Sequence, residues 1–163
     1  MIHDWKDTST WPVAWEDRTR KMAELIADGE SVIEFGCGNQ VLSSLVSYYT
    51  AVDLYDRGNG TIICDLNAET LPEFKSHDVA FLSGVIEYIN DVPRLIEMLS
   101  ETAEAVVCSY NARELSPTLD YHALGWMNHF GSNELEAMFR DEGFTCNIIR
   151  WLHGHEYLYR FEK

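Results

Sequence analysis

Apolar residues along the chain occur either in short continuous runs or at intervals of three and four positions. Short apolar runs bounded by Gly, Pro, Asn or Asp are typical of buried strands, and the spaced pattern is typical of amphipathic helices. The short runs predict strands at 31–35, 50–55, 60–66, 78–84 and 104–110, and two more within 144–163 around a turn at His153 and Gly154. The spaced residues predict helices at 13–27, 40–49, 92–99 and 132–142.

Residues at the expected helix ends support the last two helices. Asp91 is suited to an N-cap, and Pro93 is tolerated in a first helical turn. Asn133 and Glu136 have the spacing of a capping box, and Gly143 is typical of the position after a helix.

The order of these elements indicates the fold class. Strands that alternate with helices and are apolar enough to be buried on both faces favour a parallel sheet between helical layers, with right-handed crossovers. The last two strands suit an antiparallel hairpin. We therefore expect one domain over residues 1–163, an α/β fold built as a three-layer α/β/α sandwich with a mostly parallel seven-stranded sheet.

The charge of the chain excludes several partners. It has 12 basic and 27 acidic residues and a formal net charge of −15. Such a chain repels nucleic acids and anionic membrane surfaces. No apolar run reaches the length of a membrane span, and the N-terminus has no signal-peptide pattern, so we expect a cytoplasmic protein that does not bind membranes. The four cysteines form no CxxC pair, and His153 and His155 have no third ligand nearby, so we expect no metal site.

The stretch Ser31–Leu42, SVIEFGCGNQVL, places two glycines between a predicted strand and a predicted helix. Glycines at such a turn let a ligand approach the backbone, and in doubly wound sheets this position holds nucleotides. The dinucleotide pattern G-x-G-x-x-G/A has Val41 where its last Gly or Ala is needed, so NAD is disfavoured. Glu34 would repel a pyrophosphate but could pair with an ammonium group.

Acids at two further strand ends extend this site. Asp53 ends the second strand, where an acid accepts hydrogen bonds from both ribose hydroxyls in such folds. Asp65 and Leu66 follow the third strand and are suited to flank an adenine. A ligand with an ammonium group, a ribose and an adenine is S-adenosylmethionine.

These motifs resemble the class I, seven-stranded, Rossmann-like S-adenosylmethionine-dependent methyltransferases, close to their small-molecule branch. VIEFGCGNQ is similar to the family's E/D-x-G-x-G-x-G loop, with Gln40 in place of the last glycine. AVDLY, CDLN, HDVAFLSGVIEYINDV and NHFGSNELEAMFRDEGF follow in the family's order. The resemblance implies methyl transfer, with S-adenosylhomocysteine as the product. It implies cofactor binding by Glu34, Gly36, Cys37, Gly38, Asp53, Leu54, Asp65, Leu66, Ser83 and Gly84.

The resemblance also places the acceptor above the fourth and fifth strands. His129 is the first candidate for a base, because imidazole titrates near neutrality, although it could instead stabilise the following helix. Glu87 and Tyr88 are further catalytic candidates, on the methionine side and over the methyl group. The candidates for acceptor contacts are Tyr110, Asn111, Tyr121, His122, Trp126 and Trp11.

The N-terminal residues 1–29 are expected to contain a helical segment that either packs on the core or closes over the site as a lid. Trp5, Trp11 and Trp15 fit both interpretations. We expect a methyltransferase for a small-molecule or sugar-containing acceptor, with oxygen favoured over nitrogen, acting as a monomer or homodimer. The alternatives are a non-catalytic S-adenosylmethionine-binding or regulatory protein and a nucleotide-binding oxidoreductase.

Overall fold

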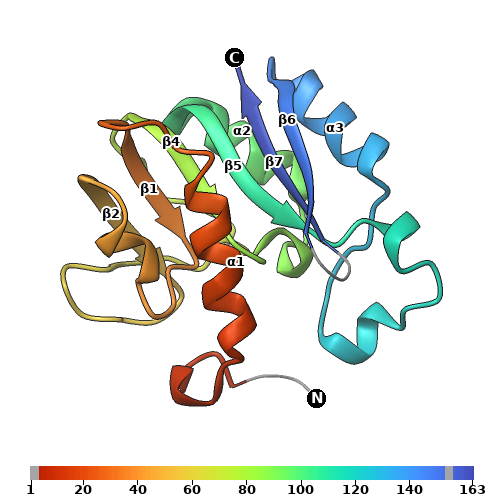
Figure 1. Cartoon of the computed structure of the whole chain (residues 1–163), viewed down its shortest axis with the longest axis horizontal. Coiled ribbons are helices and arrows are strands. Elements are labelled where there is room, and N and C mark those ends of the chain that lie inside the picture. Colours follow the sequence, from red (N-terminus) through yellow and green to blue (C-terminus); the bar gives the residue numbers. More distant parts are fainter. Residues whose placement is uncertain (1–3, 153–155) are drawn as a thin grey trace.

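Seven strands form one sheet in the order β3-β2-β1-β4-β5-β7-β6 (Figure 1). The computed structural model describes residues 4–152 and 156–163, so the predicted turn at His153 and Gly154 lies outside the described residues. The strands are β1 (Ser31–Phe35), β2 (Tyr48–Asp53), β3 (Ile62–Ile63), β4 (His77–Leu82), β5 (Ala103–Tyr110), β6 (Thr145–Leu152) and β7 (Glu156–Glu162). Strands β1 to β5 pair in parallel, and β7 pairs antiparallel with both β5 and β6. The predicted α/β class with a C-terminal antiparallel hairpin is confirmed.

Helices cover both faces of the sheet (Figure 1). Helix α1 (Val13–Ala23) packs Met22 on the face that carries Val32 and Phe81. Helices α2 (Val92–Thr102) and α3 (Ser132–Asp141) pack on the opposite face. Because successive strand residues point to opposite faces, each buried strand supplies both cores.

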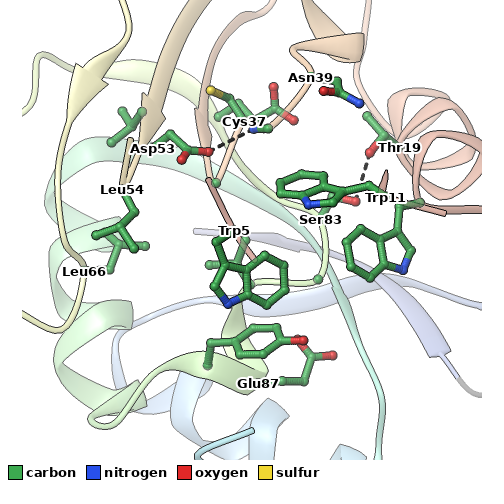
Figure 2. A pocket seen from close by; sticks show the side chains of 18 of the residues that line it. Trp5, Trp11, Thr19, Cys37, Asn39, Asp53, Leu54, Leu66, Ser83 and Glu87 are labelled. Carbon is green, nitrogen blue, oxygen red and sulfur yellow. Dashed lines mark hydrogen bonds between the residues drawn. The ribbon is translucent and has the colours of Figure 1, made fainter. Parts of the chain in front are cut away.

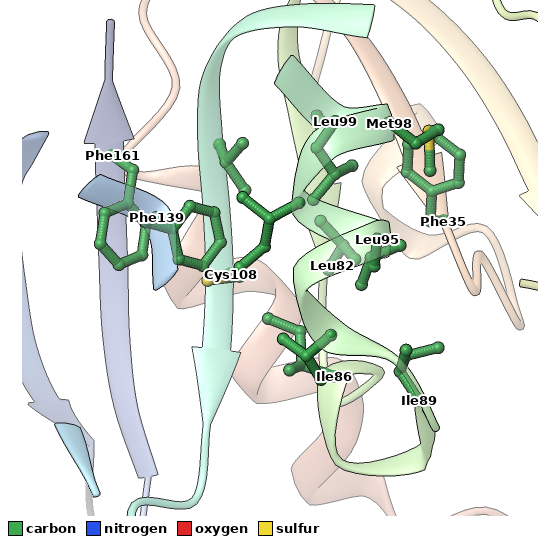
Figure 3. Packing of buried hydrophobic residues seen from close by; sticks show 14 of the residues in the cluster. Phe35, Leu82, Ile86, Ile89, Leu95, Met98, Leu99, Cys108, Phe139 and Phe161 are labelled. Atoms are coloured by element: carbon green, nitrogen blue, oxygen red, sulfur yellow. The ribbon is translucent and has the colours of Figure 1, made fainter. Parts of the chain in front are cut away.

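Aromatic stacking joins α3 to the hairpin in the larger of the two cores (Figure 3). The Phe139 ring lies 3.9 Å from the Phe161 ring at an interplanar angle of 6°. Tyr159 stacks on Phe161 at 5.3 Å, and all three side chains are buried. This contact fixes the antiparallel hairpin against the parallel part of the sheet.

The two predicted helix starts have different outcomes. Asp91 is the N-cap of α2, as predicted, and its carboxylate accepts a hydrogen bond from the Arg94 N–H at 3.1 Å. The predicted capping box of Asn133 and Glu136 is wrong. The N-cap of helix α3 is Gly131, two residues before Asn133, and it is Glu134 that accepts from the Gly131 N–H at 2.7 Å.

The connection between β1 and β2 also differs from the sequence prediction. The helix expected at 40–49 is only the short 3₁₀ helix η2 (Val41–Ser44), and β2 begins at Tyr48. Tyr48 and Tyr49 are aromatic residues that favour strands, and β2 pairs with β1 from Ser31 opposite Tyr48 onwards. Pairing in the sheet therefore outweighs a helical repeat of apolar residues.

The remaining connections are short or irregular. Helix α1 ends at Ala23, four residues before its expected end, and β3 contains only two residues. The other 3₁₀ helices are η1 (Thr8–Thr10), η3 (Ile86–Tyr88), η4 (Arg113–Leu115) and η5 (Tyr121–Leu124). Within the part of the chain that the structure describes, each helix is too short or too polar to cross a bilayer.

Candidate active site

A cavity of about 410 Å³ opens at the carboxyl ends of β1, β2 and β4, beneath the N-terminal segment and the start of α1 (Figure 2). Its volume lies in the range of small-ligand sites. The lining includes the ten residues predicted to bind the cofactor, namely Glu34, Gly36, Cys37, Gly38, Asp53, Leu54, Asp65, Leu66, Ser83 and Gly84. It also includes four of the predicted catalytic or acceptor residues: Trp11, Glu87, Tyr88 and Trp126.

The glycine turn after β1 has no room for side chains. Gly36 has φ +73°, and a Cβ there would lie 2.6 Å from Val85 Cγ2. Gly38 has φ +48°, and a Cβ there would lie 2.4 Å from the Trp11 ring. Any other residue would be strained at these backbone angles and would clash with its neighbours. The two glycines thus bring bare backbone to the cavity wall.

Glu34 lies in the floor of the cavity, and only 2 % of the residue is exposed. One of its carboxylate oxygens accepts a hydrogen bond from the Tyr49 hydroxyl at 2.5 Å. Burial raises the pKa of Glu34 to about 8, the nearby Asp53 charge adds to the rise, and the Tyr49 hydrogen bond opposes it. Glu34 is therefore mostly protonated at neutral pH.

Asp53, at the end of β2, is surrounded by N–H donors. Its carboxylate accepts from the Gly38 N–H at 2.9 Å, the Tyr55 N–H at 3.0 Å and the Arg57 Nε at 3.0 Å. Arg57 also donates to the backbone oxygens of Trp5 and Lys6. Asp53 and Arg57 thus tie the N-terminal segment to the rim of the cavity.

Arg18 of α1 forms a second polar network beside the β4 end. Its Nε donates to Ser83 Oγ at 2.9 Å, and its Nη1 lies 2.6 Å from Glu156 Oε1 of β7. A Cβ at Gly84 would lie 2.4 Å from Arg18 Nη2. The guanidinium therefore occupies the space that this glycine leaves open.

Glu87, in η3, is a buried acid with one oxygen in use. Its Oε1 accepts from the Asn111 N–H at 2.9 Å, whereas its Oε2 has no hydrogen-bond partner among the described residues. Burial and the nearby Glu156 charge raise the pKa of Glu87 to about 7. A carboxyl group that titrates near neutrality and lines a cavity is suited to accept a proton.

Aromatic side chains form another part of the cavity wall, and one of them, Trp11, lies against Gly38 of the glycine turn. The Trp5 ring lies 4.8 Å from the Tyr88 ring and 5.8 Å from the Trp11 ring, and Trp15 stacks on Trp5 at 5.9 Å. Trp126 Nε1 donates to the Tyr88 hydroxyl at 3.1 Å. These contacts bring residues from the N-terminus, η3 and the loop before α3 to one surface.

Five of the predicted acceptor or catalytic residues are not part of the described cavity lining: Tyr110, Asn111, Tyr121, His122 and His129. Tyr110 points into the core beneath α2 and α3, because it lies on the same face of β5 as Cys108. Its hydroxyl donates to Asn128 Oδ1 and accepts from the Phe130 N–H, each at 2.6 Å. These bonds anchor the loop that leads to α3.

The other four residues also lie away from the cavity. Asn111 is buried and donates its backbone N–H to Glu87, while Tyr121 and His122 belong to η5 with their rings 4.1 Å apart. His129 lies between the rings of Tyr121 and Trp126, at 5.3 and 6.0 Å. Burial and the Arg113 charge lower the pKa of His129, so the imidazole is neutral at physiological pH.

The sequence prediction did not include several residues of the lining. Arg18, Arg57 and Glu156 come from α1, the loop after β2 and β7, and the chain brings them together only in the folded state. The one sequence feature that could have indicated Arg57 is its position four residues after Asp53. No sequence feature indicated Arg18 as a site residue, because it lies within a predicted helix.

The residues of the cavity fit S-adenosylmethionine by their chemistry. The glycine turn offers backbone without side chains, and Asp53 offers a carboxylate at a strand end. Asp65 is exposed and Leu66 half-buried beside it, as flanking groups for an adenine. The one conflict is at Asp53, because a carboxylate has about four acceptor positions and three N–H groups already use three of them.

Comparison with known proteins gives a family and a set of similar folds. Residues 9–147 match the family model described as a methyltransferase domain. No curated protein sequence matches the chain.

Among solved structures, one similar chain is a methyltransferase of Haloferax volcanii in complex with the Trm112 methyltransferase activator. The two chains are 13% identical and superpose with a TM-score of 0.74, and the alignment covers 92% of this chain and 91% of the other. An S-adenosylmethionine-dependent methyltransferase of Mesorhizobium loti is 16% identical with a TM-score of 0.68, covering 88% of this chain and 96% of its own. A third similar structure is the 1,6-didemethyltoxoflavin-N1-methyltransferase of Burkholderia thailandensis with bound 1,6-didemethyltoxoflavin and S-adenosylhomocysteine. It is 17% identical with a TM-score of 0.71, and the alignment covers 99% of this chain and 83% of the other. At these identities the likeness shows a shared fold.

Proposed function

The chain belongs to the class I S-adenosylmethionine-dependent methyltransferases, and we propose that it methylates a small-molecule acceptor bound in the cavity at the carboxyl ends of β1, β2 and β4. The family match covers most of the chain and decides against a nucleotide-binding oxidoreductase. The observation that carries the proposal is that ten residues predicted from sequence to bind the cofactor line one cavity.

We assign the cofactor to the side of the cavity drawn with Asp53, Leu54 and Leu66 (Figure 2). Asp53 would accept the ribose hydroxyls, and Arg57 would turn away from it to free the acceptor positions that the ribose needs. S-adenosylmethionine supplies a methyl group on a positively charged sulfur, and the acids of the cavity are suited to such a cation.

The acceptor would lie between Glu87 and the rings of Trp5, Tyr88 and Trp126. The volume of the cavity and its aromatic wall support a small molecule rather than a macromolecule. The Burkholderia thailandensis neighbour, whose acceptor is a small heterocycle, agrees with this size class. Oxygen was favoured narrowly from sequence, because LSGVIEY stands where methyltransferases acting on the amino groups of nucleic acids have an N/D-P-P-Y type motif. That difference argues against nucleic-acid amino groups and does not weigh against a small amine.

The N-terminal segment is proposed as the cover of this site. Trp5, Trp11 and Trp15 line the cavity, and Arg57 holds the backbone of Trp5 and Lys6 beside Asp53. If ribose binding displaces Arg57 from Asp53, the segment must shift as the cofactor enters. Tryptophan fluorescence would report this shift directly.

Calorimetric titration with S-adenosylmethionine and S-adenosylhomocysteine tests the proposal, with NAD as the comparison ligand. We expect both adenosyl ligands to bind, NAD to bind much more weakly, and the Asp53→Asn variant to lose about tenfold or more in affinity. Asp28→Asn, an exposed residue in the turn after α1, is the matched control and should bind as the unaltered chain does. Folded protein that binds neither adenosyl ligand would overturn the assigned cofactor site.

A further inference from the structure

The carboxylate of Glu87 is half satisfied. The residue is 2 % exposed, its Oε1 accepts from the Asn111 N–H, and its Oε2 has no hydrogen-bond partner among the described residues. Its backbone oxygen accepts from the Met127 N–H at 2.7 Å, which holds η3 against the loop before α3. Buried polar atoms without partners are rare in proteins, so the unpaired, buried oxygen of a residue that lines the cavity points to a ligand that donates to it.

The charges around the cavity favour a cation there. The described lining has six acids and two arginines, and both arginines are already paired, Arg18 with Glu156 at 2.6 Å and Arg57 with Asp53 at 3.0 Å. Four acids have no arginine partner in the lining, and burial raises the pKa of two of them, Glu34 to about 8 and Glu87 to about 7. The four are Glu16, Glu34, Asp65 and Glu87.

The aromatic wall adds to this preference. Figure 2 shows Trp5 and Glu87 on the same side of the cavity. The Trp5 ring lies 4.8 Å from the Tyr88 ring, and the Tyr88 hydroxyl accepts from Trp126 Nε1, so three aromatic side chains line the cavity together with Glu87. The faces of aromatic rings attract cations, most strongly where water is excluded. A carboxylate beside aromatic rings is an environment that binds organic ammonium groups.

We propose that the acceptor is a primary or secondary amine, which binds as its ammonium ion against the aromatic wall and donates to Glu87 Oε2, and that Glu87 is the base that removes its proton. This inference rests on the proposed function, because it concerns the acceptor of the same cavity. It assigns nitrogen as the methylated atom.

The proton and electron balance of the step is complete within this site. Glu87 takes one proton from the ammonium ion, and the freed nitrogen lone pair forms the bond to the methyl carbon. The carbon–sulfur bond breaks, and its electron pair stays on sulfur. The product leaves as a methylated ammonium ion, and Glu87 returns its proton to water when the cavity opens.

An oxygen acceptor fits this site less well. A phenol or a carboxylic acid reacts as an anion, and that anion would lie beside Glu87 and the other acids of the lining that have no arginine partner, where like charges repel. An ammonium ion is attracted to the same acids. The acids therefore select the acceptor by charge before any chemistry occurs.

Amine binding should depend on pH through Glu87. Burial raises the pKa values of the tyrosine and cysteine side chains facing it, which stay neutral between about pH 5 and 9. Amine affinity should thus rise as pH increases through about 7, where Glu87 ionises. The titratable and charged groups that face Glu87 are Arg18 of α1, Tyr88 of η3, Cys108 and Tyr110 of β5, and Glu156 of β7.

The test compares matched small molecules on protein saturated with S-adenosylhomocysteine. Calorimetric titration measures the binding of 2-phenylethylamine, tryptamine and histamine, each beside its alcohol and its carboxylic acid counterpart. We expect at least one amine to bind about tenfold tighter than both counterparts and to become weaker below about pH 6. Amines that bind no tighter than the alcohols, or acids that bind tightest, would overturn the inference.

A variant assigns the preference to Glu87. In Glu87→Gln the amide oxygen can still accept from the Asn111 N–H, so the fold should be kept, and a melting curve checks this. We expect the preference for amines and its pH dependence to disappear, and amine-dependent release of S-adenosylhomocysteine to fall about tenfold or more. Glu97 is an exposed residue of α2, and Glu97→Gln is the control. This variant should keep the preference for amines, its pH dependence and the rate of S-adenosylhomocysteine release.

The two proposals fail in different ways. If the folded, unaltered chain binds neither S-adenosylmethionine nor S-adenosylhomocysteine, the assigned cofactor site is refuted. If these ligands bind but the amines show no preference over their counterparts, the cofactor site stands and the amine inference fails. An amine preference that survives in Glu87→Gln would show that another acid binds the cation, and that too would refute the role of Glu87.

Discussion

The ionisation of Glu34 should make the stability of this protein fall as pH rises. Glu34 is buried, and its pKa is raised from an ordinary value of 4.5 to about 8. A carboxyl group with a higher pKa in the folded state binds more protons when folded than when unfolded, so the free energy of unfolding decreases as pH rises. The decrease begins near the unfolded pKa and ends once pH passes about 8.

The magnitude follows from the pKa values. One pKa unit corresponds to about 1.4 kcal/mol, so a rise from 4.5 to about 8 corresponds to about 5 kcal/mol at most. Relaxation of the site and entry of water reduce this value, and we expect a loss of about 2–5 kcal/mol between about pH 5 and 9. Glu87, with a pKa of about 7, adds a loss of the same sign over a narrower range.

The variant Glu34→Gln isolates this contribution. The amide has nearly the same shape, can still accept from the Tyr49 hydroxyl and cannot ionise. Urea unfolding followed by circular dichroism at several pH values gives the free energy of unfolding of both proteins. The variant should become more stable relative to the unaltered chain as pH rises, by about 2–5 kcal/mol at about pH 9 compared with about pH 5.

The exposed Glu101 provides the control, because Glu101→Gln should follow the unaltered chain at every pH. A difference between Glu34→Gln and the unaltered chain that stays constant from about pH 5 to 9 would refute the reasoning. That result would mean that Glu34 ionises in the folded state without a cost, as an acid paired with a cation does.

Two further variants test how the elements around the cavity are held. Tyr110→Phe leaves the buried Asn128 Oδ1 and the Phe130 N–H without their partner, so the free energy of unfolding should fall by about 1–3 kcal/mol in urea, with S-adenosylhomocysteine affinity unchanged. A weakened affinity at unchanged stability would contradict the structural role assigned to Tyr110. Asp91→Ala removes the cap that accepts from the Arg94 N–H, and thermal unfolding should show a loss of about 1 kcal/mol. An unchanged melting temperature would mean that the cap contributes nothing to α2.

Local sequence patterns predicted an element correctly where a single local interaction determines its structure. The strand Ser31–Phe35 was predicted with its observed bounds, since a continuous apolar run in a parallel sheet has little alternative. Asp91 was identified as a cap because capping depends on neighbouring backbone alone. The glycine turn and Asp53 were predicted to share one site, and both line the cavity, because strand ends in this fold meet at one edge of the sheet.

Contacts between distant segments determined three features that local sequence patterns did not predict. The residues at 45–49 have a helical repeat, but pairing with β1 makes Tyr48 and Tyr49 part of a strand. Tyr110 was predicted to face the acceptor, but the two-residue period of β5 turns its ring into the core. Arg18 and Glu156 meet across the fold at 2.6 Å although 138 positions separate them in the chain.

The sequence by itself therefore determined the order of most elements, the fold class and a set of residues that share one edge of the cavity, because these depend on residue type and short spacing. The tertiary structure alone decided that Glu87 is buried with one oxygen unpaired among the described residues, and that four tryptophans and two arginines line the described cavity. Burial, charge pairing and ring contacts arise between distant segments. A pattern along the chain contains no distances between such segments.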